Sequence, residues 1–119
     1  MFDHIGIKVK NLKASAAFYA STLAPLGHVQ AYADESTAGF GPADAPGLWL
    51  YASDQRAGPG SHIAFRAADR TAVDRFHAAA LKAGGRDNGA PGPRPAYSAT
   101  YYAAFVIDLD GNNVEAMMP

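Results

Sequence analysis

The feature that most constrains the fold of this chain is an internal repeat. Residues 61–77 (SHIAFRAADRTAVDRFH) resemble residues 3–19 (DHIGIKVKNLKASAAFY) when the two are aligned with His62 opposite His4, an offset of 58 positions in a chain of 119. The offset also pairs Ile5 with Ile63, Lys8 with Arg66 and Phe18 with Phe76. A repeat at about half of the chain length predicts two copies of one structural unit.

Each copy of the repeat begins with a predicted strand. The segments HIGIKV (4–9) and HIAFRA (62–67) alternate between larger apolar residues and polar or small ones. Such period-two alternation is typical of a β-strand with one face on a core. The histidines that open the two segments, His4 and His62, fall on the opposite face. We therefore expect both imidazoles to point away from the packed side of the sheet.

A helix is predicted after each of these strands. Asn11 and Asp69 are suited to cap a helix, because their side-chain oxygens can accept hydrogen bonds from the first free backbone N–H groups. The helices are expected over 12–23 and 70–83, and Phe18 and Phe76 occupy matching positions on their apolar faces.

Further strands complete each copy. They are predicted at 28–33, around Phe40, at 48–53, at 101–107 and at 114–118, with a tight turn at 108–112 and a linker rich in glycine and proline at 54–60. Three prolines exclude a central strand from 90–100, which we expect to be a surface loop. The first unit thus reads β-α-β-β-β, and the repeat assigns the same order to the second.

This order of elements predicts the fold class and the domain organisation. Residues 1–119 are expected to form one α+β domain of two repeated units, at about 1–54 and 61–119. The helix of each unit covers one sheet face and leaves the second face free. Two such units can bury their free faces by curling a mixed sheet around a shared cavity, which histidine, glutamate, tryptophan and tyrosine would line.

Composition excludes several classes of partner. The formal net charge is −1, and no run of lysine and arginine is interleaved with aromatic residues, so nucleic acid is not expected as a partner. No apolar run is long enough to span a bilayer, and the N-terminus lacks the apolar core of a signal peptide. We therefore expect a cytoplasmic protein without a membrane partner. The absence of cysteine excludes disulfides, thiolate metal ligands and a cysteine nucleophile.

Three residues on the faces turned away from the helices carry metal-binding chemistry. His4, His62 and Glu115 lie on three different predicted strands. Two imidazoles and one carboxylate, with further positions left open, suit non-haem iron or catalytic zinc. Such a metal can polarise a substrate oxygen. The strand phase and the repeat relation of the two histidines support this candidate more strongly than their spacing does.

Four other residues are candidates for substrate binding. They are Trp49 and Tyr51 on the strand 48–53, Arg94 in the proline-rich loop, and Tyr101. Each also has a structural interpretation. The two aromatic residues could be core or dimer contacts, Arg94 could be a solvated surface residue, and Tyr102 could point inward in place of Tyr101.

The sequence resembles the vicinal oxygen chelate superfamily, which includes glyoxalases, extradiol dioxygenases and bleomycin resistance proteins. The resemblance covers nearly the whole chain and rests on FDHIGIKVKNLKASAAFY, GPGSHIAFRA and PGPRPAYSATYYAAFVIDLDGNNVEAMMP. It implies that His4, His62 and Glu115 hold a divalent zinc, nickel, manganese or iron ion, and that the protein forms a homodimer. One position departs from the glyoxalase pattern. Aligning LWLY with VEAM puts Trp49 where a fourth metal ligand is expected.

Two functions follow from this resemblance. The first is a metal-dependent enzyme, a glyoxalase-like lyase or a dioxygenase, that acts on a small oxygen-bearing substrate. The second is a metal-free protein that sequesters a small molecule, as bleomycin resistance proteins do. No residue stands out as the general base. The cavity could close within one chain or between two chains.

Overall fold

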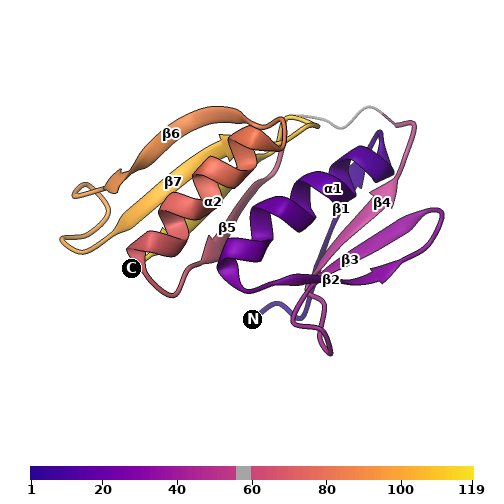
Figure 1. Cartoon of the computed structure of the whole chain (residues 1–119), viewed down its shortest axis with the longest axis horizontal. Coiled ribbons are helices and arrows are strands. Elements are labelled where there is room, and N and C mark those ends of the chain that lie inside the picture. Colours follow the sequence, from indigo (N-terminus) through magenta and orange to yellow (C-terminus); the bar gives the residue numbers. More distant parts are fainter. Residues whose placement is uncertain (56–59) are drawn as a thin grey trace.

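The two copies of the repeat fold into two β-α-β-β-β units (Figure 1). The computed structural model describes residues 1–55 and 60–119. The first unit consists of β1 (Ile5–Val9), α1 (Leu12–Leu23), a 3-10 turn (Ala24–Leu26), β2 (Val29–Ala33), β3 (Thr37–Gly41) and β4 (Leu48–Ala52). The second consists of β5 (His62–Arg66), α2 (Arg70–Lys82), β6 (Arg86–Pro93), β7 (Tyr102–Ile107) and β8 (Asn113–Met118). The α+β class and the repeated unit are thus confirmed. Most of the predicted linker at 54–60 lies outside the described residues.

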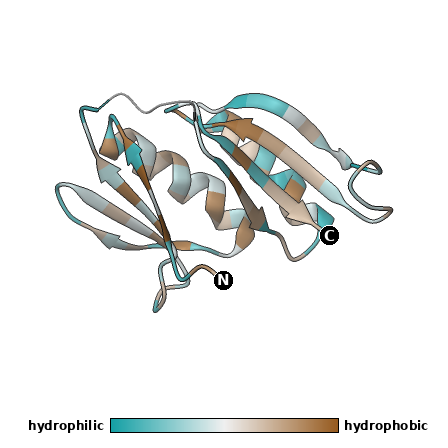
Figure 2. Cartoon of the chain, turned by 180° about the vertical axis from the view of Figure 1, so that it is seen from behind, coloured by the Kyte–Doolittle hydropathy of each residue, from teal (hydrophilic) through white to brown (hydrophobic). Residues whose placement is uncertain are grey.

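Each unit forms its own four-stranded mixed sheet. The strand order is β1-β4-β3-β2 in the first and β5-β8-β7-β6 in the second, and the parallel pairs are β1 with β4 and β5 with β8. The sheets lie side by side with both helices on the same side, and Figure 2 shows from behind the faces that the helices leave uncovered. Within one chain the two sheets are not closed around a cavity.

The second strand of the second unit corrects one prediction. Residues 90–93 are part of β6, although we expected a surface loop from 90 onward. The prolines are tolerated because β6 is an edge strand that pairs only with β7, and its register is interrupted between Asp87 and Gly89 and between Gly89 and Gly92. The exclusion of a central strand there was correct.

The helix caps form as predicted. The side chain of Asn11 accepts from the backbone N–H of Ala14 at 3.0 Å, and that of Asp69 accepts from Ala72 at 2.8 Å. Both helices then pack on their own sheets and on each other. None of the helices in the described part of the chain is long and apolar enough to cross a membrane.

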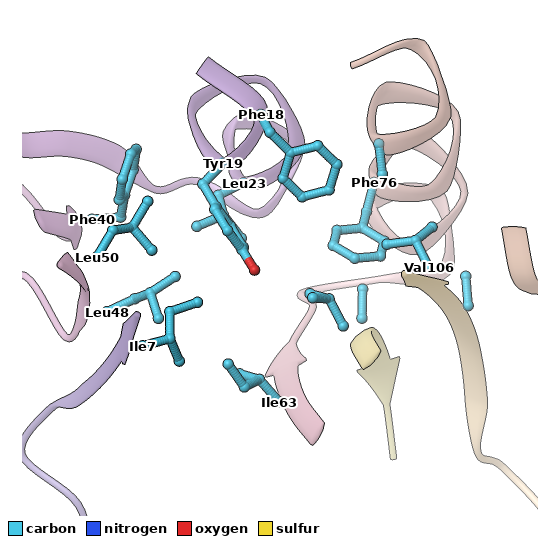
Figure 3. Close-up of a cluster of buried hydrophobic side chains, with 14 of the residues drawn as sticks. Ile7, Phe18, Tyr19, Leu23, Phe40, Leu48, Leu50, Ile63, Phe76 and Val106 are labelled. Carbon is cyan, nitrogen blue, oxygen red and sulfur yellow. The ribbon is translucent and has the colours of Figure 1, made fainter. Parts of the chain in front are cut away.

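One hydrophobic core is shared by the two units. Phe18 of α1 and Phe76 of α2 are both fully buried, and Figure 3 shows their rings in the space between the two helices. Ile63 of β5 and Val106 of β7 belong to the same cluster as the residues of the first sheet. The units therefore stabilise one another, although their sheets do not pair.

The turn between β7 and β8 fixes the second unit against α1. Asp108 is buried and accepts a hydrogen bond from the hydroxyl of Tyr19. Asp110 accepts from the backbone N–H of Lys10 at 3.0 Å and from the hydroxyl of Ser15 at 3.1 Å. Burial, followed by the charge of Asp108, raises the pKa of the Tyr19 phenol, so it remains a donor. The predicted tight turn thus also sets how the two units are oriented.

Candidate functional site

The carboxylate of Glu115 is the centre of a hydrogen-bonded group on the uncovered face of the second sheet. Its Oε2 lies 3.0 Å from Nε2 of His62, and its Oε1 accepts from the hydroxyl of Tyr101 at 2.6 Å. His62 and Glu115 share this face because Glu115 pairs with Ala64, two positions after His62. Glu115 is only 3% exposed, whereas the side chain of His62 is 52% exposed. The pair thus presents one imidazole edge to the outside over a buried carboxylate.

Two asparagines determine which nitrogen of the neutral His62 ring carries the proton. Asn88 donates from Nδ2 to Oδ1 of Asn113 at 3.2 Å, which turns the NH₂ group of Asn113 toward His62. That Nδ2 lies 2.8 Å from Nδ1 of His62. Nδ1 is then the acceptor, and Nε2 carries the hydrogen that faces Glu115. Phe105 stacks on the ring at 6.3 Å between centroids.

Tyr101 holds Glu115 and does not act as a base at neutral pH. Burial, followed by the hydrogen bond to Glu115, raises the pKa of Tyr101 to about 12. The neighbouring Tyr102 instead donates to Asp74 on α2 at 2.6 Å. Of the two tyrosines considered from the sequence, Tyr101 is the one that contacts the candidate metal ligand.

Removing the Tyr101 hydroxyl should destabilise the protein. Tyr101→Phe leaves a buried carboxylate without one of its donors, and hydrogen bonds to charged groups contribute about 1.5–3 kcal/mol. We expect a loss of that size in the free energy of unfolding, measured by urea denaturation without metal. Tyr102→Phe is the matched control and should cost less than about 1 kcal/mol, because its partner Asp74 lies at the surface. Equal losses for both variants would contradict the role given to Tyr101.

Arg94 lies near this group but is engaged by the backbone. Its guanidinium donates to the carbonyl oxygens of Ala90 at 2.7 Å and Gly92 at 3.1 Å, and it lies 5.5 Å from the centroid of the Phe105 ring. These contacts hold the end of β6. They do not test whether Arg94 also contacts a substrate, which stays a prediction.

His4, Trp49 and Tyr51 lie on the uncovered face of the first sheet. Together with Tyr32 they line a hollow of about 450 Å³. Trp49 pairs with Gly6, two positions after His4, as Glu115 pairs with Ala64, two positions after His62. The register thus places Trp49 at the position equivalent to Glu115, as the alignment of LWLY with VEAM predicts.

The structure therefore brings together two of the three predicted metal ligands in one chain. In residues 1–55 and 60–119, no group of three or more histidine, aspartate or glutamate side chains is close enough to hold a metal ion. Imidazole and carboxylate are both ligands of divalent cations, and Nε2 of His62 lies 3.0 Å from Oε2 of Glu115. Binding through Nε2 requires that the ring hydrogen moves to Nδ1 and that Asn113 turns its amide oxygen toward Nδ1. His4 belongs to the other sheet, where its Nδ1 lies 2.6 Å from Oδ1 of Asp3.

The sequence profile of the Glyoxalase/Bleomycin resistance protein/Dioxygenase superfamily matches residues 1–116. The chain belongs to this superfamily. The chain is similar to a glyoxalase/bleomycin resistance protein from Albidiferax ferrireducens T118 whose crystal structure is known. The two sequences are 31% identical, and the structures superpose with a TM-score of 0.86 over 98% of each chain. No curated protein matches the sequence significantly.

More distant structures of the superfamily share the fold. A glyoxalase/bleomycin resistance protein/dioxygenase family enzyme from Burkholderia phytofirmans PsJN has 17% identity and a TM-score of 0.75, over 97% of this chain and 95% of that one. The E144Q mutant of glyoxalase I from Zea mays has 22% identity and a TM-score of 0.74, over 96% of this chain and 45% of that one. At these identities the likeness concerns the fold alone.

Sequence reasoning missed Asn88, Asn113 and Tyr32 as parts of the two faces. The position of Asn113 immediately after the predicted turn at 108–112 is a signal for one of them, because the residue that opens the last strand there pairs with His62. Asn88 and Tyr32 carry no such signal, since their roles depend on contacts made only once the edge strands are in place.

Proposed function

We propose that this superfamily member is a homodimeric, divalent-metal-dependent enzyme that acts on a small oxygen-bearing substrate. In this proposal His62 and Glu115 of one subunit and His4 of the partner subunit hold the metal. The observation that carries the proposal is that His62 Nε2 and Glu115 Oε2 lie 3.0 Å apart on a sheet face that the same chain leaves uncovered.

The open arrangement of the sheets supports a shared site. Each chain has one uncovered face with His4 and another with the His62–Glu115 pair, and the two sheets do not close on each other. A two-fold axis that places the first sheet of one chain against the second sheet of another would create two equal cavities. Dimers are also what the resemblance to the superfamily implies.

The side chains of this protein would define the chemistry within such a cavity. A bound divalent metal supplies Lewis-acid polarisation of substrate oxygens. Glu115 contributes the negative charge, and Tyr101 keeps its carboxylate in place through Oε1. Trp49 and Tyr51 from the opposite face would exclude water from the substrate. Tyr101 keeps its hydrogen at neutral pH, so it serves as the hydrogen-bond donor that orients Glu115.

Metal titration of Glu115→Gln tests the proposal. The change keeps the volume of the side chain and removes its charge. Loss of an outer-shell partner already costs about 10- to 100-fold in metal affinity, so for a direct ligand we expect affinity for zinc, nickel, manganese or anaerobic ferrous iron to fall about a hundredfold or more. Isothermal titration calorimetry on protein freed of metal measures this directly. Glu35→Gln, which neutralises an exposed glutamate on the β2–β3 turn, is the matched control and should bind as wild type. A wild-type protein that binds none of these metals would refute the proposal.

A second candidate function is metal-free sequestration of a small molecule. The aromatic residue Trp49 at the position equivalent to Glu115 favours this function, because it offers stacking where the second unit offers a metal ligand. The same titrations separate the two candidates. Saturable binding of an aromatic ligand to protein that takes up no metal would favour sequestration.

A further inference from the structure

Three aromatic side chains lie side by side on the uncovered face of the first sheet and line the same hollow. We call Tyr32, Trp49 and Tyr51 the aromatic platform. The ring of Trp49 lies over Gly39 and that of Tyr51 over Gly6. A Cβ atom added at these glycines would come within 2.8 Å and 2.6 Å of the rings. Because glycine has no Cβ, both rings can approach the sheet backbone closely. Tyr32 and Tyr51 are 45% and 43% exposed and Trp49 is half-buried, so part of each side chain is accessible to a ligand.

Tyr32 extends the platform and positions the negative charge of Asp34 beside it. Its ring centroid is 5.6 Å from that of Trp49, with 55° between the planes. Its hydroxyl donates to Oδ2 of Asp34 at 2.6 Å, while Oδ1 accepts from the backbone N–H groups of Ser36 and Thr37. These bonds, that from Tyr32 first, lower the pKa of Asp34, so the carboxylate is charged at neutral pH.

The carboxylates at the platform favour a cation, Asp34 more than Asp3, because Nδ1 of His4, which also lines the hollow, lies 2.6 Å from Oδ1 of Asp3. Asp3 and Asp34 line the hollow of about 450 Å³ above the rings, and its lining, within the described residues, contains no lysine or arginine. Lys8 projects from the same face of β1, but its Nζ donates to Oε1 of Gln55 at 2.7 Å and it does not line the hollow. Aromatic faces attract cations through their quadrupole, and the nearby carboxylates add to this attraction.

We propose that the aromatic platform binds a planar organic cation. The flat part of the ligand stacks on Trp49, and its positive charge lies close to Asp34. This inference names a class of ligand for the proposed function, and it rests on that function only in placing the platform and the metal site in one cavity. Binding to the platform itself needs no metal.

Three compounds with the same pyridine ring and different net charges test whether the ligand must be a cation. They are the 1-methylnicotinamide cation, neutral nicotinamide and anionic nicotinate. Trp49 is the only tryptophan of the chain, so its indole N–H gives a single resonance in a ¹H–¹⁵N spectrum. With the full chain in a metal chelator, we expect the cation to shift this resonance saturably, at least about fivefold more tightly than nicotinamide. Nicotinate should cause no saturable shift.

A pair of matched variants locates the charge. Asp34→Asn keeps an oxygen for the turn and removes the charge, so the cation should bind about fivefold more weakly. Asp74→Asn makes the same change at the other exposed tyrosine–aspartate pair, Tyr102 with Asp74, and should leave binding unchanged. Equal affinity for the cation and nicotinamide, or equal effects of the two variants, would overturn the inference. Cation binding by a protein that takes up no metal would keep the platform and refute the proposed metal enzyme.

Discussion

Phe76→Ala should lower the free energy of unfolding by about 3–5 kcal/mol. Phe76 is fully buried on α2, in the core that both units share, so its removal leaves a cavity between α1 and α2. Urea denaturation followed by circular dichroism measures the loss. Because the cavity affects both units, we expect them to unfold in one transition at a lower urea concentration.

Leu81→Ala is the control on the same helix. Leu81 is 39% exposed, and its truncation should cost less than about 1 kcal/mol. Metal affinity should be unchanged in both variants, because neither residue lies on the uncovered faces of the sheets. A loss below 1 kcal/mol for Phe76→Ala would contradict the assignment of the shared core.

Mixed dimers of His4→Ala and His62→Ala should recover metal binding that neither variant shows alone. If each site takes His4 from one subunit and His62 from the other, both variants lose a ligand from every site. In a mixed dimer, one cavity lacks both histidines and the other has its complete set. We therefore expect one equivalent of metal per mixed dimer, measured by calorimetry after the two differently tagged chains have been co-expressed and purified together.

The control is a dimer in which both differently tagged chains carry His62→Ala, and it should bind no metal. Recovery in the mixed dimer requires His4 and His62 from different chains, which a site within one chain cannot provide. Absence of recovery, in variants that are still dimeric by light scattering, would reject the shared site. A monomeric wild-type protein at micromolar concentration would reject it as well.

The hydrogen bonds of Glu115 determine what its neutralisation does to stability. A carboxylate that faced an empty cavity without partners would be poorly solvated, and its neutralisation would then cost little stability in the absence of metal. Glu115 instead accepts from Tyr101 and faces the Nε2 hydrogen of His62. Part of its importance is therefore structural, which is why metal affinity and not stability is the deciding measurement for Glu115→Gln.

Local patterns determined the elements and the faces of this protein. The alternation in HIGIKV and HIAFRA places His4 and His62 on the faces away from the helices, because neighbouring strand residues point to opposite sides. Asn11 and Asp69 begin the helices through hydrogen bonds within three residues. The repeat also determined the register that makes Trp49 equivalent to Glu115. Each of these features depends on neighbouring residues or on one strand pair.

Only the tertiary structure decided which of these residues meet. The separation of His4 from His62 and Glu115 depends on how the two units are oriented, and that depends on contacts such as Tyr19 with Asp108 and Ser15 with Asp110, which join residues 89 and 95 positions apart. The sequence predicts Arg94 in a surface loop. In the structure β6 extends to Pro93, and carbonyl oxygens of this strand accept hydrogen bonds from the Arg94 guanidinium. No local periodicity encodes such contacts, because they depend on how separately folded elements pack.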